Sequence, residues 1–392
     1  MKRILAVKGY SLKKNSYGEN RIDIDGEHSS NSHIVKAFLA AKNNTPVAVK
    51  IFLTRDPLYV NRLDWLDDLD QKNKTLLFEA EIYRRVTDIP ELQENVVKFV
   101  AFEQISLREL AFSSEEDFFQ DAKSLLPFRY RNEATVDMFT VDLLVTEFAP
   151  AKILEEIVWI QTDINKKPFA PDFILPIFFQ LIWGIQVLQR HGIQHNDMHQ
   201  GNVFIKERKR SDPLLDIKRR QYICSNGAIF CMPAQAPSVL FFDWDWANTP
   251  DLTNPTFIGT DHFCTEYGYC GILDEKRDIF RACFQFLQET ALMPPEAVDF
   301  IRFILSGSPG SSKLQTKGKT MPDIGLLCNK DGTGQCMPYP PGEPLEIRSC
   351  AELLAHPCFG KYKMTSTMQK DNEELVVFLD RENQRPRLFN PK

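Results

Sequence analysis

The residues best suited to chemistry lie in one short stretch, HGIQHNDMHQGNVFI at 191–205. It contains three histidines, two asparagines and one acid, and it ends in apolar residues typical of a strand. Asp197 and Asn202 stand five positions apart on what we interpret as an irregular loop. A zinc site, a phosphoryl-transfer site and a merely capped polar loop are all open at this point. Zinc is disfavoured because no further ligands are spaced to complete a set begun by His195 and His199.

Three other polar residues fall in segments that should position them. Lys50 lies in the strand-like run VAVKIF, Glu79 in the helical run FEAEIY, and Asp243 follows the apolar run VLFF. Of the two acids in this helical run, we take Glu79 rather than Glu81 as the candidate site residue, because acids two positions apart on a helix point in different directions. A lysine fixed by a carboxylate can hold a phosphate, and carboxylate and amide oxygens suit magnesium.

The elements that must position these residues change type along the chain. Short alternating or apolar runs predict strands at 33–41, 46–53 and 142–150, and a helical pattern covers 74–86. After Pro150 the pattern predicts mainly helices, at 152–160, 172–191, 275–292, 295–305 and 350–359. Asn226-Gly227 between two apolar runs predicts a hairpin with a two-residue turn at 221–233. We therefore expect an α+β fold with a ligand cleft between a strand-rich lobe and a helical lobe.

Composition excludes some classes of protein. The chain has 392 residues, more than one core usually holds, and its net charge of -6 does not suggest nucleic-acid binding. The most apolar run, 173–188, is shorter than a membrane span and carries Gln180 and Gln186, so we expect a buried helix, capped by Asp172. The N-terminal apolar run is too short for a secretory signal. Nine cysteines without a CxxC pair predict reduced thiols and a cytoplasmic location.

The ordered set of residues resembles the protein-kinase superfamily over roughly residues 20–360. The resemblance implies a bilobal kinase-like fold, with an N-lobe at 1–147, a C-lobe at 148–360 that carries the inserted hairpin, and a tail at 361–392. It implies that Lys50 holds the phosphates of ATP, that Glu79 pairs with Lys50, and that Asp197 is the catalytic base, with His199 beside it. Mg²⁺ or Mn²⁺ would be held by Asn202 and Asp243. Asp245 is either a further metal ligand or a polar loop residue.

The resemblance also places the adenine pocket, with VTEFAP at 145–150 as the hinge. The implied nucleotide-binding residues, besides Lys50, are Ser30, Ser32, Val35, Ala48, Thr146, Glu147 and Ala149. Several positions depart from the family. The phosphate loop reads HSSNSH without glycine, DWD replaces DFG, Asn196 replaces an arginine, and 259–267 is a degenerate APE segment at best. With these departures the chain is most similar to haspin-like kinases and to protein kinases of large DNA viruses.

We therefore expect ATP-dependent transfer to a Ser/Thr hydroxyl of a protein substrate, without a nucleic-acid partner or a membrane span. Two alternatives remain open. One is a small-molecule phosphotransferase of the aminoglycoside or choline kinase type, which also carries histidine at the position of His199. The other is a pseudokinase that only binds. His195 is expected to brace the loop, and Asp278 to anchor the loop backbone from the following helix.

Overall fold

The computed structural model describes residues 11–12, 36–43, 45–55, 67–106, 139–149, 151–207, 219–224, 227–233, 235–252, 254, 275–284, 286, 292–304, 347–364, 375–379 and 388–389. Ser30, Ser32 and Val35, and the segments 259–267 and 306–345, lie outside the described residues. The chain divides into two compact units, one formed by Met1–Arg84 with Val97–Ala149 and the other by Arg85–Val96 with Pro150–Lys392. Mainly antiparallel sheets and helices make up the described parts, so the fold is α+β as expected.

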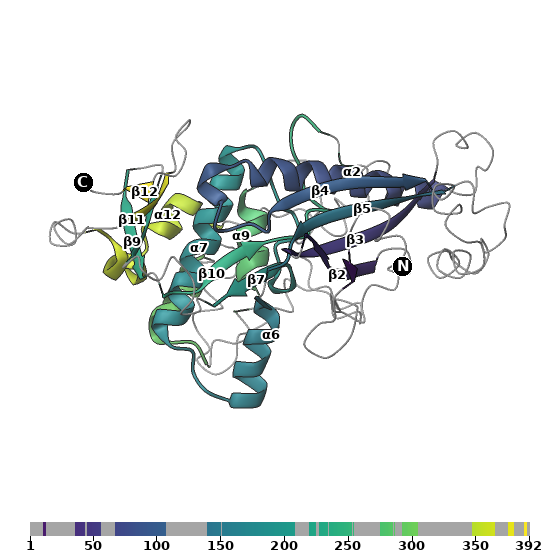
Figure 1. The fold of residues 1–392 in the computed structure, drawn as a ribbon. Helices are drawn as coiled ribbons and strands as arrows, with labels where there is room; N and C mark the ends of the chain where they lie inside the picture. Colours follow the sequence, from purple (N-terminus) through teal and green to yellow (C-terminus); the bar gives the residue numbers. More distant parts are fainter. Residues whose placement is uncertain are drawn as a thin grey trace. The chain divides into compact units, whose positions relative to one another are not determined.

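The first unit is built on a five-stranded antiparallel sheet in the order β1-β2-β3-β5-β4 (Figure 1). Its strands are β1 Ser11–Leu12, β2 Lys36–Lys42, β3 Thr45–Arg55, β4 Phe99–Ser106 and β5 Phe139–Glu147. Strands β2 and β3 form a hairpin in which Asn43 has a positive φ of 51°, a conformation that asparagine tolerates better than most residues. The predicted strands at 46–53 and 142–150 are confirmed, and β4 was not predicted.

Helix α2, Asp67–Thr87, begins seven residues before the predicted 74–86 segment. Within the first unit it lies alongside the sheet (Figure 1), and its buried residues Phe78 and Ile82 recur at a spacing of four. Leu77, on another face of the helix, is 58% exposed. Glu79 is only 2% exposed, so the helix places this acid on its buried side.

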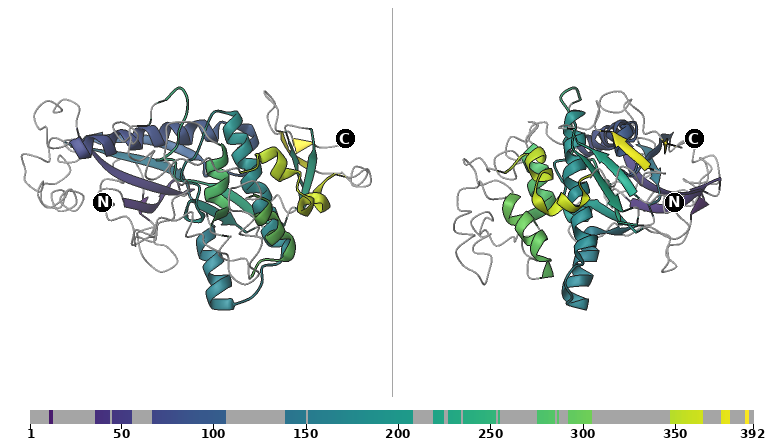
Figure 2. Two further views of the ribbon diagram at one scale, coloured as in Figure 1. Left: turned by 180° about the vertical axis from the view of Figure 1, so that it is seen from behind. Right: turned by 90° about the vertical axis from the view of Figure 1, so that its left-hand side faces the viewer.

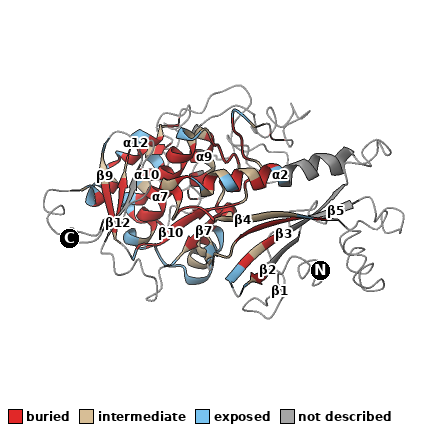
Figure 3. Cartoon of the chain, turned by 45° about the horizontal axis from the view of Figure 1, so that its top comes forward, coloured by how far each residue is buried: buried red, intermediate tan, exposed pale blue. Residues whose placement is uncertain are grey.

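The second unit is organised around α7, Pro171–Arg190, whose residues 174–188 are all buried (Figure 3). Helices α9 Glu275–Phe284, α10 Pro295–Ile304 and α12 Cys350–Leu354 contact it (Figure 2). Within the described residues α7 is the one helix long and apolar enough to span a membrane, but 83% of that apolar window is buried in the protein, as in a core helix. The expected cap is wrong. Ala170 is the N-cap residue, and Asp172 in the first turn pairs with Lys361 at 2.6 Å.

A three-stranded sheet, in the order β10-β7-β6, packs on α7. It consists of β6 Lys152–Ile153, β7 Val203–Lys206 and β10 Ser238–Phe241. The loop that contains Asp197 leads into β7, and Asp243 follows β10. The ring of Phe241 on β10 lies so close to the helix that a Cβ added at Gly184 would lie 2.6 Å from its Cζ. A side chain at Gly184 would therefore have to displace this ring, which stands two residues before Asp243.

The predicted hairpin is present as β8 Arg219–Ile223 and β9 Ile229–Pro233, but its loop is longer than predicted. The backbone N–H of Cys224 donates to the carbonyl of Ala228, so this last hydrogen bond encloses a loop of three residues rather than two, and Gly227 has a φ of +81°. The tail adds β11 Leu375–Leu379, parallel to β8, and β12 Leu388–Phe389. None of the described cysteines forms a disulfide.

Several predicted helices are shorter or less regular than expected. The 152–160 segment begins as β6, continues as α6 Leu154–Trp159 and ends in a π-helix, η5 Ile160–Asn165. Helix α9 ends at Phe284, and the 350–359 segment divides into α12 and a 3₁₀ stretch, η12 Pro357–Tyr362. Helix α10 agrees with its prediction. Shorter 3₁₀ turns occur at η3 Pro90–Leu92 and η6 Gln200–Asn202.

Candidate functional site

The loop that contains Asp197 is held by helix α9, and the main anchor is Asp278. The backbone N–H groups of His195 and Asn196 donate to the two carboxylate oxygens of Asp278, each at 2.8 Å. Asp278 is fully buried, and burial raises its pKa, although the charge of His195 and these two N–H donors oppose that shift. The predicted anchor is thus confirmed. It fixes the backbone one residue before Asp197.

Asp197 lies at the centre of a cluster of side chains. Its Oδ1 accepts from Nη2 of Arg281 at 2.6 Å, and its Oδ2 accepts from Nδ2 of Asn202 at 3.0 Å. Nε2 of His199 lies 3.5 Å from Oδ2. The sequence expectation that Asp197 and Asn202 act together is therefore matched by a direct hydrogen bond between their side chains.

These neighbours determine the ionisation of Asp197. Burial raises the pKa of Asp197, but the positive charge of Arg281 and the hydrogen bond with His199 outweigh burial and hold it well below its ordinary value. The side chain is consequently a carboxylate, able to accept hydrogen bonds only. Burial lowers the pKa of His199, but the hydrogen bond and charge of Asp197 outweigh it, so the net shift is upward.

His199 also shapes the loop beyond Asp197. Its Nδ1 accepts from the backbone N–H of Gly201 at 3.0 Å and so caps the 3₁₀ turn η6. The neutral imidazole with its hydrogen on Nε2 satisfies both Gly201 and Asp197, whereas protonation of Nδ1 would break the first contact. Gly201 is required here, since an added Cβ would lie 2.6 Å from Cε1 of His199 and 3.1 Å from Oε2 of Glu155.

The segment around Asp243 is tied to the same loop. Gln194 and Asn248 exchange backbone hydrogen bonds of 3.0 and 2.8 Å. The side-chain Nδ2 of Asn196 donates to the backbone carbonyl of Trp246 at 3.0 Å. Nε2 of His195 lies 2.9 Å from the carbonyl of Phe242. The charge of Asp243 acts on His199, where it favours the protonated imidazole. The segment before and after Asp243 is thus fixed against the Asp197 loop, and His195 braces the loop as expected.

Two residues of this assembly have unusual backbone conformations. Asn196 has a φ of 64° and Asp243 a φ of 67°, in the left-handed region that asparagine and aspartate adopt more readily than other residues with side chains. Such positions cost of order 1–3 kcal/mol and persist only where the surroundings enforce them. The two positions are the residue before Asp197 and Asp243 itself, both of them next to or among the candidate site residues. The left-handed conformation gives a physical reason for asparagine at position 196.

In the first unit, the structure brings Lys50 of β3 and Glu79 of α2 together. Nζ of Lys50 lies 2.9 and 3.1 Å from the two carboxylate oxygens of Glu79. The choice of Glu79 over Glu81 is confirmed, because Glu81 instead pairs with Arg84 on the helix surface at 2.7 Å. A buried carboxylate is tolerated when it is paired, so Glu79 fixes the direction of the lysine.

The hinge candidates lie at the end of β5. Ala48 and Thr146 face each other across the β3–β5 ladder, and Thr146 is buried. The N–H of Glu147 donates to the carbonyl of Lys98 at 2.9 Å. That N–H is therefore engaged within the sheet. Ala149 follows outside the strand.

The metal candidates are a set of hard oxygen donors. No group of three or more His, Cys, Asp or Glu side chains in the described part of the chain is placed to hold a metal ion. The amide nitrogen of Asn202 donates to Asp197, so its oxygen faces elsewhere, and Asp243 adds a carboxylate. The carbonyl of Asp245 accepts from Asn254 at 2.8 Å. Carboxylate and amide oxygens are of the hard type that Mg²⁺ prefers.

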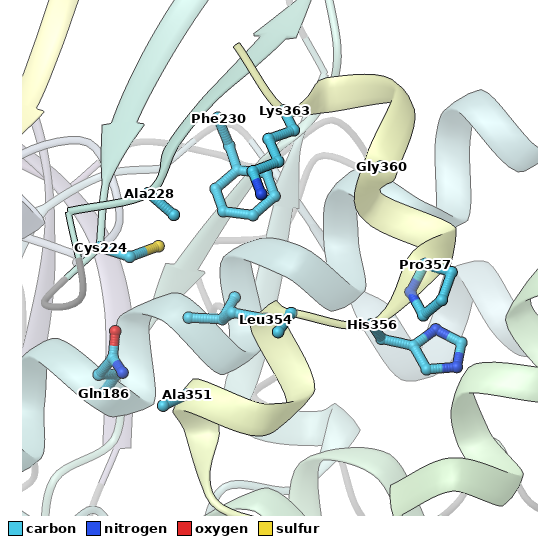
Figure 4. A pocket seen from close by; sticks show the side chains of 11 residues that line it. Gln186, Cys224, Ala228, Phe230, Ala351, Leu354, His356, Pro357, Gly360 and Lys363 are labelled. Carbon is cyan, nitrogen blue, oxygen red and sulfur yellow. The ribbon is translucent and has the colours of Figure 1, made fainter.

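A separate pocket of about 260 Å³ lies elsewhere in the second unit (Figure 4). It is lined by α7, the β8–β9 hairpin and the chain from α12 to Lys363, with Gln186, Cys224, Phe230 and His356 among its walls. None of the catalytic, nucleotide-binding or metal candidates proposed from the sequence lines this pocket. The candidate functional residues therefore form two groups, the Asp197 cluster in the second unit and the Lys50–Glu79 pair in the first unit.

No protein-family model matches the chain, and no curated protein matches it. Function must accordingly be inferred from the residues themselves.

Three residues that contact the Asp197 loop or shape it were not predicted from the sequence: Arg277, Arg281 and Gly201. Nη1 of Arg277 donates to Oδ1 of Asn196 at 3.2 Å. One signal was present, since the two arginines flank Asp278 at a spacing of four and therefore share a face of α9.

Proposed function

We infer that the protein transfers the γ-phosphoryl group of ATP to a Ser/Thr hydroxyl of a protein substrate. The observation that carries this proposal is the Asp197 cluster. A partly buried carboxylate is held by Asn202, its loop is anchored by Asp278, and Asp243 is tied to the same loop. Phosphoryl transfer needs these parts: a group that orients the acceptor, oxygen donors for a metal, and rigid placement of both.

In this proposal Asp197 positions the acceptor hydroxyl and takes its proton. A carboxylate with a lowered pKa is a weak base, but the transition state of phosphoryl transfer is loose, so orientation matters more than early proton removal. Asn202 and Asp243 would hold Mg²⁺, which neutralises charge on the transferred group when it is bound. Asp245 remains a candidate for a further ligand.

The Lys50–Glu79 pair is assigned to the nucleotide. Lysine is a compact cation with three donors, and a bidentate contact with a buried carboxylate holds it in one direction. We propose that Lys50 contacts the phosphates of ATP, with Ala48, Thr146, the Glu147 carbonyl and Ala149 near adenine. Ser30, Ser32 and Val35 would complete the nucleotide site from outside the described residues.

The test is phosphate transfer from radiolabelled ATP, with Mg²⁺ or Mn²⁺, to a panel of proteins. Asp197→Ala should lower transfer by about 10²–10⁴-fold, the usual contribution of a positioned general base. Asp299→Ala is the matched control, because Asp299 is 77% exposed on α10. An Asp197→Ala variant with more than half of wild-type activity would show that the cluster is not catalytic.

One observation favours a second candidate, a small-molecule phosphotransferase. His199 is hydrogen-bonded within the Asp197 cluster, and histidine at this position is a feature of aminoglycoside and choline kinases. Aminoglycosides and amino alcohols in the acceptor panel separate the two, since only the small-molecule enzyme should transfer to them faster than to any protein. Binding of ATP without transfer to any acceptor would instead indicate a pseudokinase.

A further inference from the structure

Helix α9 holds three successive residues of the Asp197 loop. Asp278 binds the backbone of His195 and Asn196, and Arg277 binds the side chain of Asn196. Arg281 reaches the next residue, Asp197, from one turn further along the same helix face. The first two contacts fix the backbone and the neighbouring side chain. The third acts directly on the carboxylate that the proposed function makes catalytic.

The contact between Arg281 and Asp197 is short and sheltered. Nη2 lies 2.6 Å from Oδ1, and the two side chains are 18% and 15% exposed. A charge-assisted bond at this distance is stronger than a neutral one, and limited solvent access strengthens it further. On the other side of the carboxylate, Asn202 holds Oδ2 at 3.0 Å. With one oxygen held from each side, the carboxylate cannot rotate about its Cβ–Cγ bond without losing a contact.

We propose that Arg281 is a positioning residue for the transfer reaction: it fixes the plane of the Asp197 carboxylate against the acceptor hydroxyl. This inference rests on the proposed function. The alternative, in which Arg281 only blocks Asp197, predicts the opposite outcome, because removing the arginine would then release the carboxylate and raise activity. A misplacement of about 1 Å can lower catalysis by about 10²-fold, so the two possibilities are well separated.

The kinetic test compares Arg281→Gln, Arg281→Lys and Arg281→Ala with Arg302→Gln, an exposed arginine on α10. Arg281→Gln should lower kcat by about 10–100-fold, with little change in the KM for ATP, and Arg281→Lys should retain part of the activity. Free guanidinium, at concentrations that leave the wild type folded, should restore transfer by Arg281→Ala but not by Asp197→Ala. Unchanged or increased kcat in Arg281→Gln, or no rescue of Arg281→Ala, would overturn the positioning role.

A second measurement does not depend on activity. Urea unfolding of Arg281→Gln, Asp197→Asn and the double variant should be non-additive by at least about twofold in the unfolding constant, as for side chains in contact. Additive effects would overturn the inference even for an active enzyme. A wild type that transfers no phosphate would overturn the proposed function and the catalytic role together, and non-additivity would then make Arg281 a structural ion pair only.

Discussion

Removal of Asp278 should both destabilise the second unit and disorganise the Asp197 loop. The carboxylate is fully buried and accepts two backbone N–H groups at 2.8 Å. Asp278→Ala leaves both donors without this acceptor inside the protein. Each buried donor left unsatisfied costs about 1–3 kcal/mol, so the expected loss in the free energy of unfolding is about 2–6 kcal/mol. Asp278→Asn keeps one acceptor oxygen and should lose about half as much.

The assay is urea unfolding followed by tryptophan fluorescence. Four of the five tryptophans, Trp159, Trp183, Trp244 and Trp246, belong to the second unit, so the signal reports mainly on that unit. Asp299→Ala is the control and should change stability by less than about 1 kcal/mol, since Asp299 is an exposed partner of His356. Phosphate transfer by Asp278→Asn should fall even under conditions where the variant is folded.

The result that would refute the reasoning is a stability of Asp278→Ala within about 0.5 kcal/mol of wild type, the range of surface substitutions. Such a result would mean that water or another group takes the two N–H donors, and that Asp278 is not the anchor of the loop. A stable variant that also transfers phosphate normally would show that α9 is not needed to position the Asp197 loop.

Three further outcomes are expected. Lys50→Ala and Glu79→Gln should both weaken the thermal stabilisation of the protein by ATP, and unchanged stabilisation in both would contradict the nucleotide assignment. Gly184→Ala should cost about 1–3 kcal/mol by overpacking against β10, whereas Gly360→Ala, where an added Cβ meets nothing within 4 Å, should not; equal effects on urea unfolding would contradict the packing. Phosphatase treatment should leave transfer unchanged, because Asn196 offers no cation to a phosphate on the segment 248–269. A tenfold loss, reversed by rephosphorylation, would show that another cation serves there.

The environment of Arg277 supports the prediction that phosphatase treatment leaves transfer unchanged. This arginine reaches the side chain of Asn196, but it is only 4% exposed and its Nη1 is engaged with that amide. A buried guanidinium that already holds the loop does not need a phosphate to bring it into place. Arg277 therefore supports the loop from α9, and we expect that no phosphate is needed to order it.

Local patterns in the sequence predicted much of the secondary structure. Alternation and apolar runs gave β3, β5 and the β8–β9 hairpin, and helical spacing gave α2, α7 and α10, because each pattern reflects one buried face of one element. The end points were less well predicted. Pro171 begins α7 without a cap from Asp172, and the hairpin loop has one residue more than Asn226-Gly227 suggested, since neighbouring packing and register decide such details.

The order of Lys50, Glu79, Asp197, Asn202 and Asp243 in the sequence indicated phosphoryl-transfer chemistry, because the types and spacing of these side chains are visible without a structure. The sequence could not show what holds them. Arg281 meets Asp197 across 84 positions, and Asp278 meets the loop backbone across 82 and 83. No local pattern encodes a contact between a helix face and a distant loop. Only the tertiary structure, by packing α9 against that loop, decided which charges act on Asp197.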